Sequence, residues 1–156
     1  MKVLVANRSA VQSSQVDQYF SLDHLKDFLT ACDVVVVTLP LTEQTRSLIN
    51  ANELAAMKPK AVLVNVGRGL VIDEQALFAA LKHQRIGGAI IDTWYQYPNS
   101  ETATCNPSKF DFASLDNVLM TPHMSGWTEG TVQRRKQTIA DNINRLHQGQ
   151  SLLNVL

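Results

Sequence analysis

Short aliphatic segments without polar alternation recur along the chain and limit most strongly how it can fold. They are bounded by turn or polar residues, and they are Lys2–Ala6, Asp33–Thr38, Ala61–Val66, Gly88–Asp92 and Asn117–Met120. Runs of this kind are typical of strands that are buried on both faces. Because amphipathic stretches lie between them, the alternation predicts an α/β fold with a parallel sheet and covering helices.

Three of the amphipathic stretches are predicted as helices. One follows Ser21, a residue type that caps helix N-termini, a second begins at Asp73, and a third runs from about Thr128 to His147. The third helix is expected to place on one face Val132, Ile139, Ile143 and Leu146. Residues 95–114 form a long irregular stretch, and loops of that length in compact domains are usually functional or mobile.

Composition excludes several classes of protein. With 156 residues, 45% of them hydrophobic, the chain fits one domain. Lys+Arg and Asp+Glu are both 14, so charge gives no reason to expect a nucleic acid or an anionic membrane as a partner. The apolar run at 34–37 is far shorter than the ~20 residues that span a bilayer. Cys32 and Cys105 form no metal-ligand spacing, which favours reduced thiols in a soluble cytoplasmic protein.

Arg68 is a candidate substrate-binding residue. It stands between Gly67 and Gly69, directly after an aliphatic run, at the end of a strand where open α/β sheets bind ligands. A guanidinium group can grip both oxygens of a carboxylate, which Lys cannot do. These residues alone fit equally well a turn Arg that caps a helix or pairs with Asp73.

His123 and Asp92 also follow predicted strands. His123 comes after Pro122, and an imidazole can accept or donate a proton near pH 7. A lone His at a strand end is more often an ordinary polar residue. Asp92 precedes an aromatic-rich segment and would lie near a ligand, unless it only accepts backbone hydrogen bonds in the turn.

Further motifs complete a pattern that covers nearly the whole chain. In order, they are Leu39-Pro40-Leu41-Thr42, Met57-Lys58-Pro59, Asn65-Val66-Gly67-Arg68-Gly69, Asp73-Glu74, Gly88-Ala89, Asp92 and Thr121-Pro122-His123. Their order and spacing resemble the nucleotide-binding domain of the D-isomer-specific 2-hydroxyacid dehydrogenases. The combined signature is far more specific than a single Gly-rich loop.

The resemblance implies a role for each candidate residue. Arg68 would bind and polarise a small 2-oxo acid, such as glyoxylate or hydroxypyruvate, and His123 would be the general acid/base. The residues implied in binding the cofactor are Thr38, Leu39 and Pro40 at the adenosine, Asp92, Ser125 and Gly126 near the nicotinamide, and Val66 and Gly67 beside Arg68. No metal is implied, and the family suggests a homodimer.

Tyr97 departs from the family pattern. Relatives usually carry an acid five positions beyond the Asp, where it hydrogen-bonds the catalytic His. Tyr97 can hydrogen-bond His123 but supplies no negative charge at pH 7 to favour the imidazolium form. We therefore expect reductase activity to fall off at lower pH than in relatives that carry the acid. Glu101 offers a substitute acid.

The beginning of the chain resembles the family's second Rossmann strand, and the sequence holds no Gly-x-Gly-x-x-Gly. The expected fold is therefore a Rossmann-like doubly wound parallel sheet that lacks its first strand and Gly-rich loop. Residues 1–156 would form a partial NAD(P)-binding domain, without the substrate domain. We expect the loss of a central strand to leave two strand edges unpaired.

Asn7, Arg8 and Ser9 suggest which cofactor is preferred. They occupy the end of that second strand, where dinucleotide folds carry an acid for the ribose 2′-hydroxyl or an Arg for a 2′-phosphate. Arg8 with its hydroxyl neighbour favours NADP(H) over NAD(H), although a surface Arg at a strand end is common.

Three functional hypotheses follow. The first is an NAD(P)-dependent oxidoreductase of the D-2-hydroxyacid dehydrogenase or 2-oxoacid reductase type, present as a fragment that is inactive alone. The second is a non-catalytic nucleotide-binding or regulatory module, which Tyr97 and the absent Gly-rich motif favour. The third is a truncated remnant whose exposed strand edges pair with another copy.

Overall fold

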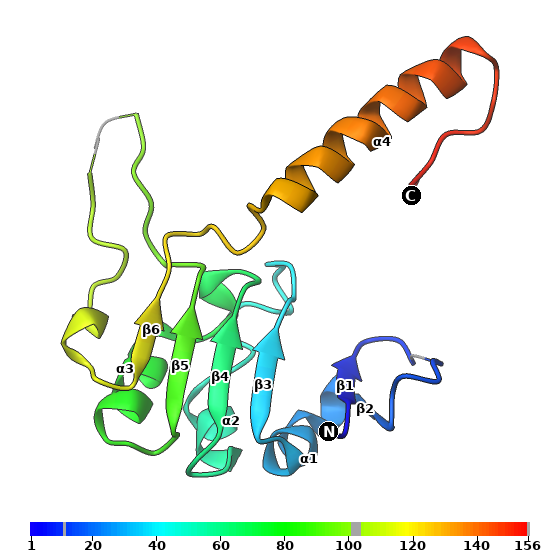
Figure 1. The fold of residues 1–156 in the computed structure, drawn as a ribbon. Helices are drawn as coiled ribbons and strands as arrows, with labels where there is room; N and C mark the ends of the chain where they lie inside the picture. The colour runs from blue at the N-terminus through cyan, green and yellow to red at the C-terminus, as the bar shows by residue number, and fades with distance from the viewer. Residues whose placement is uncertain (11, 101–103, 156) are drawn as a thin grey trace. The chain divides into compact units, whose positions relative to one another are not determined.

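A computed structural model describes residues 1–10, 12–100 and 104–155. The chain divides into two compact units, Met1–His123 and Met124–Leu156. The strands, all in the first unit, are β1 (Leu4–Asn7), β2 (Gln18–Ser21), β3 (Val34–Val37), β4 (Val62–Asn65), β5 (Gly88–Ile91) and β6 (Val118–Met120) (Figure 1). The α-helices are α1 (Leu25–Ala31), α2 (Ala51–Ala56), α3 (Glu74–Lys82) and, in the second unit, α4 (Glu129–His147). The short 3-10 helices are η1 (Leu22–His24), η2 (Gly69–Val71) and η3 (Phe112–Ser114).

The larger sheet has four parallel strands in the order β3-β4-β5-β6. Its register aligns Val35 with Leu63 and Leu63 with Ala89. Each of the five predicted segments overlaps a strand, with bounds that differ from the expectation by at most two residues. The predicted class, an α/β fold with a parallel sheet, is therefore confirmed.

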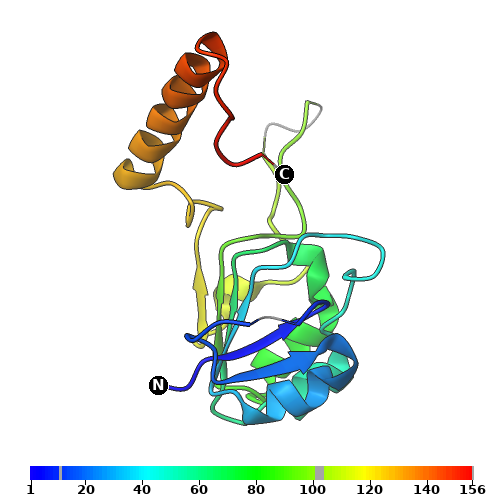
Figure 2. The same cartoon turned by 90° about the vertical axis from the view of Figure 1, so that its right-hand side faces the viewer.

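A second, two-stranded parallel sheet joins β1 to β2 and aligns Leu4 with Gln18. Figure 2 views the molecule from the side on which these two strands lie. Among the described residues, β1 pairs only with β2 and β3 only with β4, so the facing edges of β1 and β3 are not bonded to each other. A cavity of about 190 Å³ separates these edges, and α1 also lines it. The two unpaired edges agree with the expectation from the sequence.

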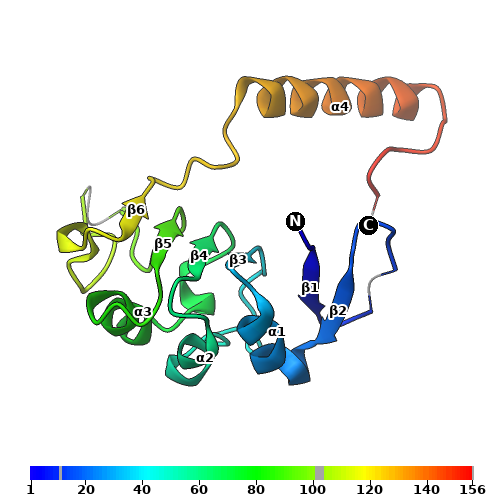
Figure 3. The same ribbon diagram turned by 60° about the horizontal axis from the view of Figure 1, so that its bottom comes forward.

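The expectation that both faces of the strand are buried is wrong for β3. Val35 and Val37 are buried, whereas Val34 and Val36 are each 56% exposed. Figures 1 and 3 show α1, α2 and α3 in a row along one face of the larger sheet. Within this unit the described helices therefore cover one face of β3, and its other face remains open.

Two of the three predicted helices begin at a residue whose side chain caps the helix. Asp73 accepts a hydrogen bond from the Ala76 N–H at 2.8 Å, and Thr128 accepts one from the Thr131 N–H at 3.1 Å. Such bonds satisfy backbone donors that have no partner within the helix. Ser21 occupies the cap position of η1, but its side chain makes no capping bond.

Candidate active site

The parallel sheet brings four candidate segments to one end. Thr38 follows β3, Arg68 follows β4, Asp92 follows β5, and His123 follows β6 by three residues. Because the carboxyl ends of parallel strands lie at the same edge, these segments share the end of the sheet where open α/β folds bind ligands (Figure 1).

Asn65, the last residue of β4, organises the loop that carries Arg68. Its side chain is 2% exposed, accepts a hydrogen bond from the Gly67 N–H at 3.1 Å and donates one to the Arg68 carbonyl at 3.2 Å. Arg68 itself is exposed, and its Nη1 donates to the Gly67 carbonyl at 2.7 Å. No ion pair joins Arg68 to Asp73 within the described part of the chain. Asn65 was not among the predicted site residues, although a polar residue at the end of a buried strand is a signal of a functional role.

Gly67 and Gly69 allow this loop to lie between its neighbours. A Cβ at Gly67 would be 2.8 Å from the Leu39 carbonyl oxygen, in the loop after β3. A Cβ at Gly69 would overlap the Trp94 carbonyl, in the loop after β5. Only glycine therefore permits the Arg68 loop to pack against both adjacent strand-end loops.

Asp92 and Trp94 connect the ends of β5 and β6. Asp92 is 1% exposed, and its Oδ1 accepts a hydrogen bond from the Thr121 hydroxyl at 2.6 Å. The indole N–H of Trp94 donates to the Thr121 carbonyl at 2.9 Å. Thr121, two residues before His123, is thus held by these two bonds and by its own N–H, which donates to the Ile91 carbonyl at 3.0 Å. Asp92 has a structural role here, and its expected contact with the nicotinamide remains a prediction.

His123 lies beside Tyr97 at the surface. Their ring centroids are 5.5 Å apart, with 49° between the planes, and His123 has a backbone φ of 58°. The Tyr97 hydroxyl accepts a hydrogen bond from the Trp94 backbone N–H at 2.8 Å. The contact that the structure shows between Tyr97 and His123 is therefore between rings. Glu101, the substitute acid considered above, lies outside the described residues.

The adenosine-side candidates come from two strands. Asn7 ends β1 and accepts a hydrogen bond from the Arg8 N–H at 2.9 Å, while Arg8 and Ser9 are exposed. Thr38 and Leu39, at the end of β3, line the cavity between β1 and β3. Two predicted adenosine residues therefore face the cavity that borders β1.

The remaining cofactor candidates are divided between the two units. Pro40 is exposed and accepts a hydrogen bond from the Thr45 hydroxyl at 2.7 Å. Val66 is half-buried, and its N–H donates to the Val37 carbonyl at 3.1 Å. Ser125 and Gly126 belong to the second unit, in which both are exposed.

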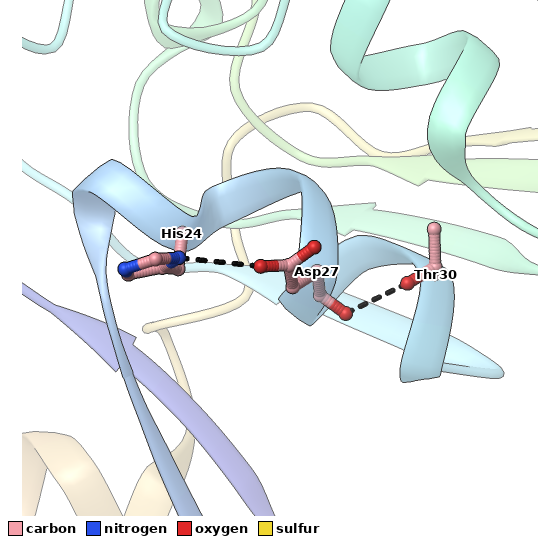
Figure 4. Close-up of polar contacts among 3 residues, drawn as sticks. All are labelled: His24, Asp27 and Thr30. Carbon is pink, nitrogen blue, oxygen red and sulfur yellow. Dashed lines mark hydrogen bonds and ion pairs between the residues drawn. The ribbon is translucent and has the colours of Figure 1, made fainter.

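His24 illustrates a histidine without a place in this site. Figure 4 shows it at the start of α1, where Nδ1 lies 3.2 Å from Oδ2 of Asp27 and Thr30 donates to the Asp27 carbonyl at 2.8 Å. The side chains of His24 and Asp27 are mostly exposed. This contact belongs to the local helix start.

Among the described residues, no cluster of three or more His, Cys, Asp or Glu could hold a metal ion. The described helices include none that is long and apolar enough to cross a membrane.

Comparison with known proteins connects this arrangement to a family. Residues 1–125 match the family described as "D-isomer specific 2-hydroxyacid dehydrogenase, NAD binding domain". Glyoxylate/hydroxypyruvate reductase B from Enterobacter agglomerans is 40% identical over 126 residues, which are 81% of this chain and 36% of that protein. Glyoxylate reductase from Thermococcus kodakarensis is 32% identical over 150 residues, 96% of this chain and 43% of that protein.

A solved structure extends the comparison to the fold. The D-isomer specific 2-hydroxyacid dehydrogenase from Xanthobacter autotrophicus, in complex with NADPH and MES, aligns with a TM-score of 0.79 and 35% identity. The alignment covers 99% of this chain and 60% of that one. The chain thus spans about two fifths of the curated relatives' length and corresponds to their nucleotide-binding part.

Proposed function

The chain belongs to the D-isomer specific 2-hydroxyacid dehydrogenase family, and we propose that it is the nucleotide-binding part of an NADP(H)-preferring 2-oxo acid reductase. The observation that carries this proposal is the position of Arg68 and His123. Both are exposed, and both follow parallel strands at the same end of one sheet. Relatives of this chain include glyoxylate and glyoxylate/hydroxypyruvate reductases, so small 2-oxo acids are the proposed substrates.

Arg68 and His123 have different roles in the proposed reaction, since Arg68 binds the substrate and His123 transfers a proton. The Arg68 guanidinium is suited to bind the carboxylate of a 2-oxo acid with two parallel N–H···O bonds, which orients the neighbouring carbonyl. An imidazolium at His123 can donate its proton to the carbonyl oxygen during reduction, and the neutral imidazole can recover it during oxidation. A nicotinamide cofactor, when bound, would supply the hydride in its reduced form during reduction and would accept it in its oxidised form during oxidation.

The described residues offer groups that suit the 2′-phosphate end of such a cofactor. Arg8 and Ser9, exposed at the end of β1, offer a cation and a hydroxyl donor suited to a ribose 2′-phosphate. Asp92, Ser125 and Gly126 are proposed for the nicotinamide end, and Thr38, Leu39 and Pro40 for the adenosine. NADPH in a solved relative supports the preference for the phosphorylated cofactor.

Titration calorimetry of the purified chain with NADPH and NADH tests the cofactor proposal. We expect tighter binding of NADPH, and Arg8→Ala should weaken NADPH binding about tenfold while changing NADH binding little, because one charge-assisted contact to phosphate is lost. Arg85→Ala, an exposed Arg after α3, is the matched control. Unchanged NADPH affinity in Arg8→Ala would refute the role of Arg8.

Turnover separates an enzyme from the non-catalytic alternative. Tyr97, at the position where the family pattern has an acid, favours a binding module. Reduction of glyoxylate or hydroxypyruvate, monitored by NADPH absorbance, should be abolished in His123→Gln and Arg68→Ala if the chain is catalytic. Cofactor binding without any turnover, even when the chain is joined to the substrate domain of a glyoxylate reductase, would instead support the module.

The proposal also includes the oligomeric state and the cellular compartment of the protein. We propose a homodimer, which the free edges of β1 and β3 support because unpaired edges are templates for pairing with another chain. Cys32 and Cys105 are free thiols, which supports a reducing cytoplasmic location. Sedimentation and cell fractionation test these two points.

A further inference from the structure

Tyr97 is anchored at its hydroxyl end. The hydroxyl accepts the Trp94 backbone N–H at 2.8 Å, and the Trp94 indole N–H donates to the Thr121 carbonyl at 2.9 Å. Trp94 is itself buried, with its ring 5.9 Å from that of Phe112. The Tyr97 hydroxyl is therefore bonded to the backbone of Trp94, and the Trp94 side chain packs in the core and bonds the segment that leads to His123.

The other end of the phenol reaches His123. A centroid separation of 5.5 Å lies within the range of about 4.5–7 Å typical of interacting aromatic rings. His123 also has a φ of 58°, a left-handed backbone conformation that is uncommon for a residue with a side chain. Its ring direction therefore depends on an unusual backbone conformation and on the neighbour that it packs against.

We propose that Tyr97 is a positioning residue that holds the imidazole of His123 by ring contact. The proposal rests on the proposed function of His123 as the acid/base. A carboxylate partner would select the imidazolium, whereas packing against a neutral phenol can hold the imidazole both before and after it gives its proton to the substrate oxygen. Tyr97 itself makes and breaks no bond in this step.

The histidine ring signals in the NMR spectrum of the purified chain test the contact directly. In the wild-type protein, nuclear Overhauser effects should connect the Tyr97 and His123 ring protons, and the phenol ring current should displace the His123 signals. His123→Gln identifies those signals. His24, His83 and His147 are internal references in the same spectrum.

Two substitutions separate the ring from the hydroxyl. Tyr97→Phe keeps the ring and should keep most of the displacement, whereas Tyr97→Leu should remove it and leave the other three histidines unchanged. The proposal is overturned if Tyr97→Leu leaves the His123 signals in place, or if Tyr97→Phe moves them as far as Tyr97→Leu does. The wild-type Overhauser effect remains decisive if a variant fails to fold, because absence of that effect also overturns the contact.

Turnover of the chain joined to the substrate domain of a glyoxylate reductase provides the functional readout, because the chain alone is expected to be inactive. Tyr97→Leu should lower kcat by at least about tenfold, because a misplaced proton donor is costly, while the KM for the 2-oxo acid changes less than about twofold since Arg68 is untouched. Tyr97→Phe should retain most of kcat. Equal loss in both variants would overturn the positioning role. Activity that survives in His123→Gln would refute the proposed acid/base instead, and the ring spectra would be unaffected by that result.

Discussion

Single glycines decide whether the Arg68 loop can lie where it does. Gly69→Ala would place a Cβ against the Trp94 carbonyl, so we expect a destabilisation of about 1–3 kcal/mol, as for other overpacked sites. Gly126→Ala is the matched control, because nothing lies within 4 Å of a Cβ there. Urea denaturation measures both. Equal midpoints for the two variants would contradict the tight packing at Gly69.

Tyr95 has a buried hydroxyl with no hydrogen-bond partner among the described residues. Burial raises the pKa of this phenol above its ordinary value of 10.0, and Glu74 and Asp73 raise it further. Because folding raises the pKa of this phenol, the unfolded chain loses the phenol proton at a lower pH than the folded chain does. The free energy of unfolding therefore decreases as the pH rises above about 10. Below that pH the phenol contributes no such loss.

Tyr95→Phe should therefore leave stability unchanged or higher at pH 8, and its advantage should grow at pH 11. Tyr19→Phe is the matched control, because the Tyr19 hydroxyl donates to the Asn7 carbonyl at 2.9 Å and its loss should cost about 1 kcal/mol. Thermal unfolding at the two pH values measures both variants. A loss above about 1 kcal/mol in Tyr95→Phe at pH 8 would show that the hydroxyl is bonded.

Tyr97 also sets an expectation for pH dependence. A carboxylate at this position would favour the imidazolium form of His123, so Tyr97→Glu should move the alkaline limb of the kcat/KM profile for 2-oxo acid reduction to higher pH, by about one unit. Tyr97→Gln, similar in size but uncharged, should not produce this shift. An identical shift in both variants would exclude charge as its cause.

The strand β2 and the helix α2 were not predicted from local sequence patterns, for physical reasons. The strand β2 has the sequence Gln-Tyr-Phe-Ser, which is short and polar at both ends, and only its pairing with β1 makes it a strand. The helix α2 has six residues, too few for helical periodicity to appear. Its capping box, in which Asn50 and Glu53 bond each other's backbone, was a signal that could have located it.

The free edge of β3 leads to a prediction about association. Val62 donates to the Asp33 carbonyl and Val66 to the Val37 carbonyl, and backbone groups of a strand in a parallel ladder alternate between its two neighbours. The N–H of Val36 therefore faces the edge away from β4. Proline at that position would remove a donor from the free edge while leaving the ladder to β4 intact.

Val36→Pro should accordingly reduce concentration-dependent self-association of the chain, measured by sedimentation velocity. Val118→Pro is the matched control, because the same alternation turns its N–H toward the outer edge of β6. If Val118→Pro alone disperses the oligomer, association uses the opposite edge of the sheet.

At the scale of the whole molecule, the core belongs to one unit. Every residue of the buried hydrophobic cluster lies between positions 25 and 112, within Met1–His123. We therefore expect a chain ending at His123 to keep cooperative thermal unfolding, with a midpoint within a few degrees of that of the full chain. Far-UV circular dichroism measures this. A non-cooperative melt would show that the second unit is needed for the core.

The sequence by itself determined the parallel α/β class, five of the six described segments that become strands, and the candidates Arg68, Asp92 and His123. These features depend on local patterns, since aliphatic runs need burial and strand ends carry the polar residues of the site. Only the tertiary structure decided that Asn65 holds the Arg68 loop and that one face of β3 stays open. It also decided that the Tyr97 hydroxyl bonds Trp94 while its ring meets His123. The reason is that some of these features depend on contacts between separate loops or strands, and others depend on which groups compete for one hydrogen-bond donor. The spacing of residues along the chain specifies neither the contacts nor the outcome of that competition.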